Sequence, residues 1–324
     1  MAIFDKLQPV SAVLQDLKDC GVDSVNVVME RFIAPFEAVI NGRRTVLAGT
    51  NNYLGLTFDP ECIRAACEAL QQEGTGTTGS RMANGTYAGH IALERELAGF
   101  FGRKGAIVFS TGYLAILGML TALAGPGDVI LIDADCHASI YDGCRLGGAQ
   151  FMLFKHNDVG DLEKRLRRLG PRTENALVVV EGIYSMRGDR ALLSDIAAVK
   201  KNYGACLLVD EAHSVGVLGK QGRGLAEEAG VEEDVDFVVG TFSKSLGAIG
   251  GYCVSNHPQL ELVRCVSRPY IFTASSSPSV IASTRVALKI LQTRPELRRR
   301  LWENARKVYH RLKDLGFVLG PEPS

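Results

Sequence analysis

The sequence predicts an α/β fold in which helices cover both faces of a seven-stranded, mostly parallel sheet. Seven short apolar runs follow one another between residues 106 and 254, mostly separated by segments with helical spacing. The runs are apolar throughout rather than alternating, which is typical of strands that are buried on both faces. The predicted strands are 106–109, 129–132, 151–154, 176–180, 205–209, 237–239 and 251–254.

Helical spacing fills most of the gaps between these strands. Such segments carry apolar residues three and four positions apart, as helices that pack on a sheet do. The predicted helices between the strands are 113–123, 138–146, 162–169 and 192–202. Upstream, we expect a helix over 60–72 and another whose apolar face is formed by Leu93, Leu97, Phe100 and Phe101. Nearer the amino terminus, a helix around 13–17 and an extended run over 36–39 are expected to serve packing.

The composition indicates a globular chain with a large core. Hydrophobic residues make up 46% of the 324 positions, which allows one large domain and part of another. We expect an N-terminal segment over 1–45, a large domain over 46–265 and the beginning of a smaller C-terminal domain over 266–324. The 36 Lys and Arg residues equal the 36 Asp and Glu residues, so no net charge attracts nucleic acid.

Targeting features and cysteine spacing both favour a cytoplasmic protein. The amino terminus lacks the long apolar core of a signal peptide, and no apolar run reaches the roughly 18 residues needed to span a bilayer. The eight cysteines are scattered without Cys-x-x-Cys spacing, and several lie in apolar, strand-like runs. We interpret them as reduced thiols of the core, with no indication of disulfides or of zinc.

The stretch from Gly74 to Gly79 matches the letters G-x-G-x-x-G of dinucleotide-binding loops. That fingerprint follows a strand and opens a helix, whereas the residues before Gly74 have helical spacing. A dinucleotide site is therefore not expected here. Together with Ser80, Arg81 and Asn84, the loop still suits the wall of an active site, where backbone amides face a ligand.

Polar residues gather directly after the predicted strands, where ligands bind in parallel sheets. Gly112 and Tyr113 follow the first strand and begin a helix, so their free amides and the helix dipole suit a phosphate. The other residues at such positions are His137 after the second strand, Ser185 after the fourth, Asp210 and His213 after the fifth, and Thr241, Ser243 and Lys244 after the sixth.

Each of these residues also has a plainer interpretation when it is taken alone. Lys244 could be a solvated lysine in a polar loop, and His137 a satisfied histidine of the core. Asp210 could cap a helix or bind a metal together with His213, although no third ligand is spaced to complete such a site. Ser185 could merely shape a turn. As a set, the residues supply an amine, an acid, an imidazole and a phosphate cradle.

One cofactor, pyridoxal 5′-phosphate, explains this combination. Its aldehyde needs an amine, which Lys244 offers as a Schiff base when a partly dry pocket lowers the lysine pKa from about 10.4. Its ring nitrogen must stay protonated, which the carboxylate of Asp210 would enforce. His137 would stack on the ring, and His213 and Ser185 would donate to the phenolate oxygen. The phosphate would take the amides of Gly112 and Tyr113 and the hydroxyls of Thr241 and Ser243.

Over nearly its whole length the chain resembles the α-oxoamine synthases, fold-type I pyridoxal-phosphate enzymes that condense an amino acid with an acyl-CoA and release carbon dioxide. The segments that carry the resemblance are 52–55, 74–85, 133–137, 181–186, 210–213 and 241–244. Loops 74–86 and 268–275 are most similar to the bacterial members that join L-serine to palmitoyl-CoA and form 3-ketodihydrosphingosine, a precursor of sphingolipids.

The resemblance implies roles for individual residues. Lys244 would hold the cofactor and remove the α-proton of serine, while Asp210 and His137 would complete the catalytic set. Thr273 would join the cofactor-binding residues, and Asn52 and Arg81 would bind substrate. Family members are homodimers that share their active sites, so Asn52 and the turn at 273–275 would serve the partner subunit's site.

The sequence departs from the family pattern at its carboxyl end. The family's smaller domain continues beyond residue 324 and carries an arginine that pairs with the substrate carboxylate. This chain holds only the opening of that domain, an amphipathic helix with an apolar side and a basic side. The apolar side carries Leu297, Leu301, Val308 and Leu312, and the basic side Arg298, Arg299, Arg306 and Arg311. The basic side is expected to be solvated, with a weak peripheral membrane contact as the alternative.

Three functions are compatible with the sequence. The favoured one is the serine- and palmitoyl-CoA-dependent condensation. The second is the reaction of another family branch, such as 8-amino-7-oxononanoate synthase or 2-amino-3-ketobutyrate CoA ligase, with a different amino acid and a shorter acyl-CoA. The third is a catalytically silent partner subunit. Such a subunit would be expected to lack the lysine, and Lys244 is present.

Overall fold

The computed structural model describes residues 3–21, 27–321 and 323, and the chain divides into two compact units, Met1–Thr50 and Asn51–Ser324. The division of the larger unit at residue 265 stays a prediction. Among the described residues, no helix combines the length and the apolar character that crossing a bilayer requires.

The first unit contains a helix and a small antiparallel sheet. The elements are η1 (Asp5–Leu7), α1 (Gln8–Asp19), β1 (Met29–Ala34), β2 (Glu37–Ile40) and β3 (Arg43–Val46), with strand order β1-β2-β3. Asn41 and Gly42 join β2 to β3 with φ values of 50° and 69°, the left-handed pair that a two-residue hairpin turn needs. The predicted helix is present, but no residue of α1 is buried, so its expected packing is not seen among the described residues.

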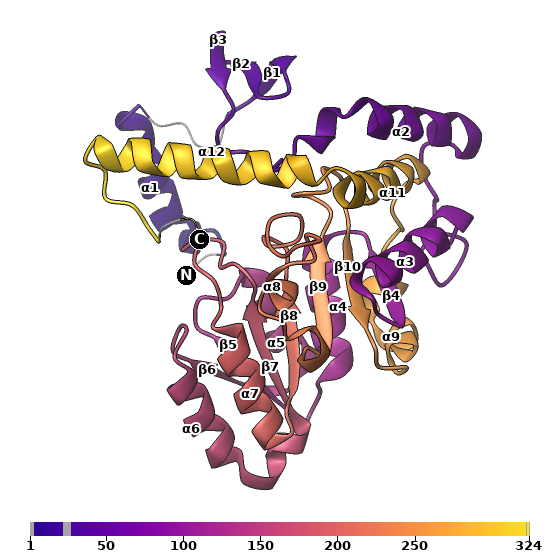
Figure 1. Cartoon of the computed structure of the whole chain (residues 1–324), viewed down its shortest axis with the longest axis vertical. Coiled ribbons are helices and arrows are strands. Elements are labelled where there is room, and N and C mark those ends of the chain that lie inside the picture. Colours follow the sequence, from indigo (N-terminus) through magenta and orange to yellow (C-terminus); the bar gives the residue numbers. More distant parts are fainter. Residues whose placement is uncertain (1–2, 22–26, 322, 324) are drawn as a thin grey trace. The chain divides into compact units, whose positions relative to one another are not determined.

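The second unit is built on a seven-stranded sheet, which confirms the predicted fold class. Its strands are β4 (Gly105–Phe109), β5 (Val129–Asp133), β6 (Gln150–Phe154), β7 (Ala176–Glu181), β8 (Cys206–Asp210), β9 (Phe237–Thr241) and β10 (Gly251–Ser255). Their order is β4-β10-β9-β8-β7-β5-β6, and all seven predicted strands are present (Figure 1). Strand β10 runs antiparallel to both of its neighbours, β4 and β9, whereas the other strand pairs described in this sheet are parallel. Every residue of β5 and β7 is buried, as their continuous apolar sequence predicts.

Helices cover both faces of this sheet. The four crossover helices are α4 (Gly112–Leu123), α5 (Ala138–Gly147), α6 (Val159–Leu169) and α7 (Leu193–Tyr203), all at predicted positions. The chain moves one way along the sheet through α4 and α5 and returns through α6 and α7. Because parallel crossovers are right-handed, the two pairs lie on opposite faces. The helices of each pair also pack against each other.

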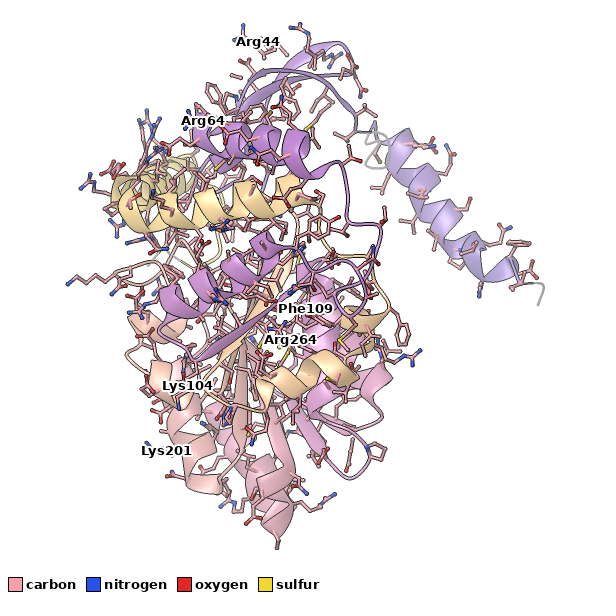
Figure 2. The ribbon with its side chains drawn as sticks, turned by 90° about the vertical axis from the view of Figure 1, so that its right-hand side faces the viewer. Arg44, Arg64, Lys104, Phe109, Lys201 and Arg264 are labelled. Carbon is pink, nitrogen blue, oxygen red and sulfur yellow. The ribbon has the colours of Figure 1, made fainter. Side chains whose placement is uncertain are left out.

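Further helices extend these layers. They are η2 (Leu56–Phe58), α2 (Pro60–Glu73), α3 (Ala88–Phe101), η3 (Gly170–Asn175), α8 (Leu225–Glu228), η4 (Glu232–Asp234), α9 (Leu260–Val266), α10 (Arg268–Ile271), α11 (Pro278–Thr293) and α12 (Pro295–Asp314). Helix α3 packs on β4 through its predicted apolar face, and α11 packs along α2. At the β4 edge of the sheet, where Figure 2 labels Phe109 and Arg264, the Arg264 guanidinium of α9 donates to the carbonyl of Ala106, at 2.9 Å.

The cysteines only partly follow the prediction. All eight are free thiols, and Cys62, Cys136, Cys144 and Cys253 are buried in the core as expected. The prediction is wrong for Cys20, Cys67 and Cys265, which are exposed. Those three lie on or next to helices rather than in strands, so the apolar-run argument did not apply to them.

Burial in the sheet predicts which core positions matter most for stability. Leu208 lies on β8 and is fully buried, so Leu208→Ala is expected to lower the free energy of unfolding by about 2–5 kcal/mol. The matched control is Leu146→Ala on α5, because Leu146 is 68% exposed and its loss should change stability by less than about 0.5 kcal/mol. Urea denaturation of both variants checks this, and equal losses would contradict the burial pattern.

Candidate active site

A cavity of about 310 Å³ opens at the carboxyl ends of the parallel strands. Eight of the predicted site residues line it: Gly112, Tyr113, His137, Asp210, His213, Thr241, Ser243 and Lys244. Thr111, Ser139, Glu181, Ala212, Gly240, Ile249 and Gly250 complete the wall. These residues follow the strands in the sequence, and the cavity lies where the carboxyl-end rule for parallel sheets predicts a ligand to bind.

Strand β10 brings the beginning of α4 next to the end of β9. Gly251, the first residue of β10, pairs with Phe109 on one side and with Thr241 on the other. A Cβ atom on Gly251 would lie 2.6 Å from the Cα of Gly112, and a Cβ on Gly112 would lie 2.7 Å from the Cβ of Thr241. Only glycine fits at both places, so the start of α4 can lie directly against Thr241.

The helix start itself is fixed by a side-chain cap. The hydroxyl of Thr111 accepts the N–H of Leu114 at 3.1 Å, which satisfies one of the unpaired amides of the first turn of α4. The hydroxyls of Thr241 and Ser243 are 2.9 Å apart on the facing loop. Amides at a helix start and two hydroxyl groups together form a site suited to a phosphate.

The loop that carries Lys244 is anchored by a buried aromatic ring. Phe242 is fully buried, and its ring stacks on Tyr252 with centroids 5.6 Å apart. Its backbone bonds Gly250 and Ala248 across the loop at 2.9 Å each. Phe242 thus fixes the loop in the core. Lys244 follows two residues later in the same loop and lines the cavity.

The amine of Lys244 is poised for reaction. Among the described residues, its Nζ has no hydrogen-bond or ion-pair partner, although the side chain is largely buried. Burial lowers the pKa of Lys244 from its usual value, and the carboxylates of Asp210 and Glu181 partly oppose that shift. A lowered pKa increases the fraction of neutral amine, which is the nucleophilic form.

Two carboxyl groups face this amine from adjacent strands. Asp210 ends β8 and Glu181 ends β7, and the two residues are register partners. Burial raises the pKa of Asp210, and burial together with the charge of Asp210 raises the pKa of Glu181 to about 8. The pair therefore carries less than two negative charges at neutral pH, and a cation placed beside Asp210 would restore its charge.

His213 is held neutral in the wall of the cavity. Its Nδ1 lies 2.7 Å from the hydroxyl oxygen of Tyr53. Burial, with the positive charge of Lys244, lowers the pKa of His213 to about 4. The neutral ring therefore has Nδ1 engaged, which leaves Nε2 for a ligand in the cavity.

Four predicted residues lie away from the wall of this cavity. Ser185 lines a neighbouring cavity of about 480 Å³, which shares His213 with the first. Asn52 donates to the hydroxyl of Thr57 at 2.6 Å. Thr273 lines a cleft of about 10 Å³ together with Arg81.

Arg81 is occupied by a buried charge cluster rather than facing the Lys244 cavity. Its guanidinium lies 2.9 Å from the carboxylate of Glu94, which also pairs with Arg264 at 3.0 Å. Both guanidinium groups lie over the ring of Tyr270, at 5.4 and 5.6 Å from its centroid. Direct substrate contact within the same subunit is therefore not what this geometry provides, and the substrate role of Arg81 stays a prediction.

The glycine-rich loop follows a helix, as predicted, and its residues do not line the Lys244 cavity of this chain, so its expected place in the wall of an active site stays a prediction. Helix α2 precedes it, not a strand. A Cβ on Gly79 would lie 2.6 Å from Cγ of Asn84, and the carbonyl of Gly79 accepts the N–H of Ser275 at 2.9 Å. The loop therefore holds the 274–276 segment in place.

Two cavity neighbours were not assigned a role from the sequence. Glu181 stands at the tip of the fourth predicted strand, where the carboxyl-end rule could have identified it. Tyr53 belongs to the segment 52–55, but its contact with His213 joins residues 160 positions apart. No local spacing encodes such a contact.

The residues present fit pyridoxal 5′-phosphate. The unpartnered amine of Lys244 suits its aldehyde, and the buried acid of Asp210 suits its ring nitrogen. The space beside Gly112, which has no side chain toward Thr241, suits its phosphate.

Comparison with known proteins agrees with this site. The family model described as "Aminotransferase class I and II" matches residues 45–324. The chain belongs to this aminotransferase class I and II family. Within the family, a serine palmitoyltransferase of Caulobacter vibrioides is 57% identical over all of this chain and 80% of the relative.

Solved structures of family members match equally well. A Sphingomonas wittichii serine palmitoyltransferase is 54% identical, with a TM-score of 0.96 over 99% of this chain and 81% of that one. A serine palmitoyltransferase structure with bound pyridoxal phosphate is 52% identical, also with a TM-score of 0.96 over 99% and 81%. These likenesses confirm the resemblance to the α-oxoamine synthases and the fold-type I assignment.

The depressed pKa of His213 predicts a pH dependence of stability. A histidine in the unfolded chain protonates near pH 6.5, whereas folded His213 protonates near pH 4. Between these values the unfolded state binds more protons, so this group makes stability fall as the pH drops, by at most about 1.4 kcal/mol per pH unit.

His213→Asn should remove that contribution. The difference in unfolding free energy, variant minus unmutated chain, is expected to rise as the pH falls from 6.5 to 4.5 and to stay constant between pH 7 and 8. Urea denaturation across this range measures it. A difference that is the same at pH 4.5 and pH 7 would show that His213 titrates normally.

Proposed function

We propose that this chain is a pyridoxal-phosphate-dependent acyltransferase that condenses L-serine with palmitoyl-CoA, releasing carbon dioxide, coenzyme A and 3-ketodihydrosphingosine. The observation that carries the proposal is the largely buried, unpartnered amine of Lys244 beside the acids of Asp210 and Glu181. The likeness to serine palmitoyltransferases supports the choice of substrates. Sphingolipid biosynthesis would be the pathway served.

Particular residues would hold the cofactor. Lys244 would bind its aldehyde carbon through Nζ, and Asp210 would accept the proton of its ring nitrogen. The amides of Gly112 and Tyr113 and the hydroxyls of Thr241 and Ser243 would bind the phosphate. His137 would face the ring, and His213 and Ser185 would donate to the phenolate oxygen. When bound, the cofactor supplies an electron sink that stabilises a carbanion at the α-carbon of an amino acid.

Proton transfer would be the task of Lys244. Its neutral amine would accept the α-proton of L-serine at Nζ. The lowered pKa keeps a usable fraction of the amine neutral, while Asp210 and Glu181 prevent the pKa from falling so far that Nζ could not hold the proton. The same amine would return a proton to the product carbon after carbon dioxide has left.

The working form is proposed to be a homodimer with shared active sites. Asn52 and Thr273 lie outside the Lys244 cavity of their own chain, and Thr273 follows Phe272, whose side chain is 71% exposed. An exposed aromatic next to a predicted site residue is what a subunit interface at that turn would cover. The predicted cytoplasmic location is part of the same proposal and fits eight unpaired cysteines.

Substrate choice distinguishes this proposal from its neighbours in the family. Thiol release from palmitoyl-CoA should depend on L-serine and fall at least tenfold with glycine or alanine. Pimeloyl-CoA with alanine, and short acyl-CoA with glycine, test the two other family branches. Faster turnover in either combination would replace the proposed substrates, and absence of thiol release in all of them would support a silent subunit.

The covalent link to the cofactor can be mapped directly. Borohydride reduction of the loaded protein should add the mass of the reduced cofactor to the peptide that contains Lys244. Lys244→Ala should abolish that adduct, whereas the control Lys201→Ala should keep it, because Lys201 is exposed on α7 and 72% of its side chain is accessible. Mass spectrometry reads both outcomes. An adduct on another lysine would refute the assignment.

The phosphate cradle is testable through its glycine. Gly112→Ala places a Cβ 2.7 Å from Thr241 and should separate the two sides of the cradle, weakening cofactor binding at least tenfold. The matched control is Gly99→Ala on α3, where an added Cβ meets nothing within 4 Å. Absorbance titration with pyridoxal phosphate measures both dissociation constants. Unchanged binding by the Gly112 variant would mean that the phosphate lies elsewhere.

A further inference from the structure

Glu181 is a buried acid in the cavity wall that the proposed reaction leaves without a task. It is the last residue of β7 and only 2% exposed, and its register partner on β8 is Asp210. Burying a carboxyl group beside a second one is costly unless it makes compensating contacts. The contacts that Glu181 makes therefore indicate why an acid stands there.

Its carboxyl group interacts with backbone N–H groups from two different loops. The amide of His137, which follows β5, donates to Oε1. The amide of Ser185, four residues after Glu181 in the loop that leads away from β7, acts on the same carboxyl group and lowers its pKa against the effect of burial. A single side chain thus joins the two loops that carry the predicted ring-facing imidazole and the predicted phenolate donor.

Both loops have a second, weaker attachment. The Nδ1 atom of His137 lies 2.8 Å from the hydroxyl of Ser139, the second residue of α5. The Ser185 loop is closed by the N–H of Gly188, which donates to the carbonyl of Tyr184 at 2.7 Å. These bonds hold each loop to itself.

The two loops are also joined to each other by the ion pair of Arg187 with Asp135. A second connection runs through His156, which lies 2.9 Å from Asp133 and 2.8 Å from Asp189. The Glu181 carboxyl group is the link that reaches the amide of His137 itself.

The role of Glu181 does not depend on its negative charge. The groups that face it are the acid of Asp210 and the amine of Lys244, and the imidazole of His137 lies nearby. Its pKa is raised to about 8, so a large share of the molecules carry a neutral Glu181 at neutral pH. A neutral carboxyl group still accepts hydrogen bonds from amides. Glu181 can therefore accept hydrogen bonds in both protonation states, whereas it carries a negative charge in only one of them.

We propose that Glu181 is a positioning residue that sets the places of His137 and Ser185 by accepting their backbone N–H groups. The inference rests on the proposed function, because His137 and Ser185 need defined positions only if they contact the cofactor. The link itself is a property of this chain. If acceptance is what matters, a glutamine should replace Glu181 well and an apolar side chain of the same length should not.

Three variants of the full chain test this. Glu181→Gln keeps an oxygen acceptor, and Glu181→Met keeps the length but leaves two amides without a partner. The control is Asp236→Leu. Asp236 also accepts a backbone N–H, that of Leu207 at 2.7 Å, and it precedes β9 at the opposite end of the sheet. It therefore reports the effect of losing a carboxylate on general stability.

Hydrogen exchange at the amides of His137 and Ser185 is the first measurement, read by mass spectrometry with residue-level fragmentation. We expect at least tenfold faster exchange at both amides in Glu181→Met and less than threefold change in Glu181→Gln and Asp236→Leu. The second measurement is the dissociation constant of pyridoxal phosphate, which should rise at least tenfold in Glu181→Met alone.

Three results would overturn the proposal. They are unchanged exchange in Glu181→Met, equal effects of the Met and Gln variants, and equal effects of Glu181→Met and Asp236→Leu at the two amides. Failure of the unmutated chain to bind pyridoxal phosphate would instead contradict the proposed function. In that case the exchange measurements would still decide whether Glu181 links the two loops.

Discussion

The close approach of the α4 start to β9, across the first residue of β10, is the constraint on which the rest of the site depends. Strands β4 and β9 are not neighbours, since β10 separates them. The amides of α4 reach Thr241 only because Gly251 and Gly112 have no side chain at the crossing. An antiparallel strand begins where its parallel neighbours end, so Gly251, the first residue of β10, lies at the carboxyl ends of the parallel strands and lets the start of α4 approach Thr241.

Burial at the strand ends produces the chemistry of the cavity. The same loss of water that lowers the pKa of Lys244 raises those of Asp210 and Glu181 and holds His213 neutral. None of these shifts needs a special local sequence. They arise because the strand tips carry polar residues into a space enclosed by a large apolar core, whose burial offsets the cost.

The sequence predicted those parts of the protein that depend on local pattern. Continuous apolar runs identified the strands, and the residues that follow them included Lys244, Asp210 and His137. The antiparallel direction of β10 could not be predicted, because the apolar composition of residues 251–254 suits a parallel and an antiparallel strand equally. Other features depend on tertiary neighbours, which no spacing in the chain encodes. They are the contact of Tyr53 with His213, the position of Ser185 in the second cavity and the pairing of Arg81 with Glu94.

The glycine-rich loop shows how the same letters can meet a different physical need. In a dinucleotide site, glycines let a backbone approach a pyrophosphate. Here Gly79 has no room for a side chain because that of Asn84 lies against it. The carbonyl of Gly79 accepts the N–H of Ser275, almost two hundred residues later. Arg81 in the same loop is neutralised by Glu94, which also holds Arg264. The loop and the buried charge cluster therefore fix the segment that carries Thr273. If that turn serves a partner subunit, the loop and the cluster contribute to catalysis by holding the turn in place.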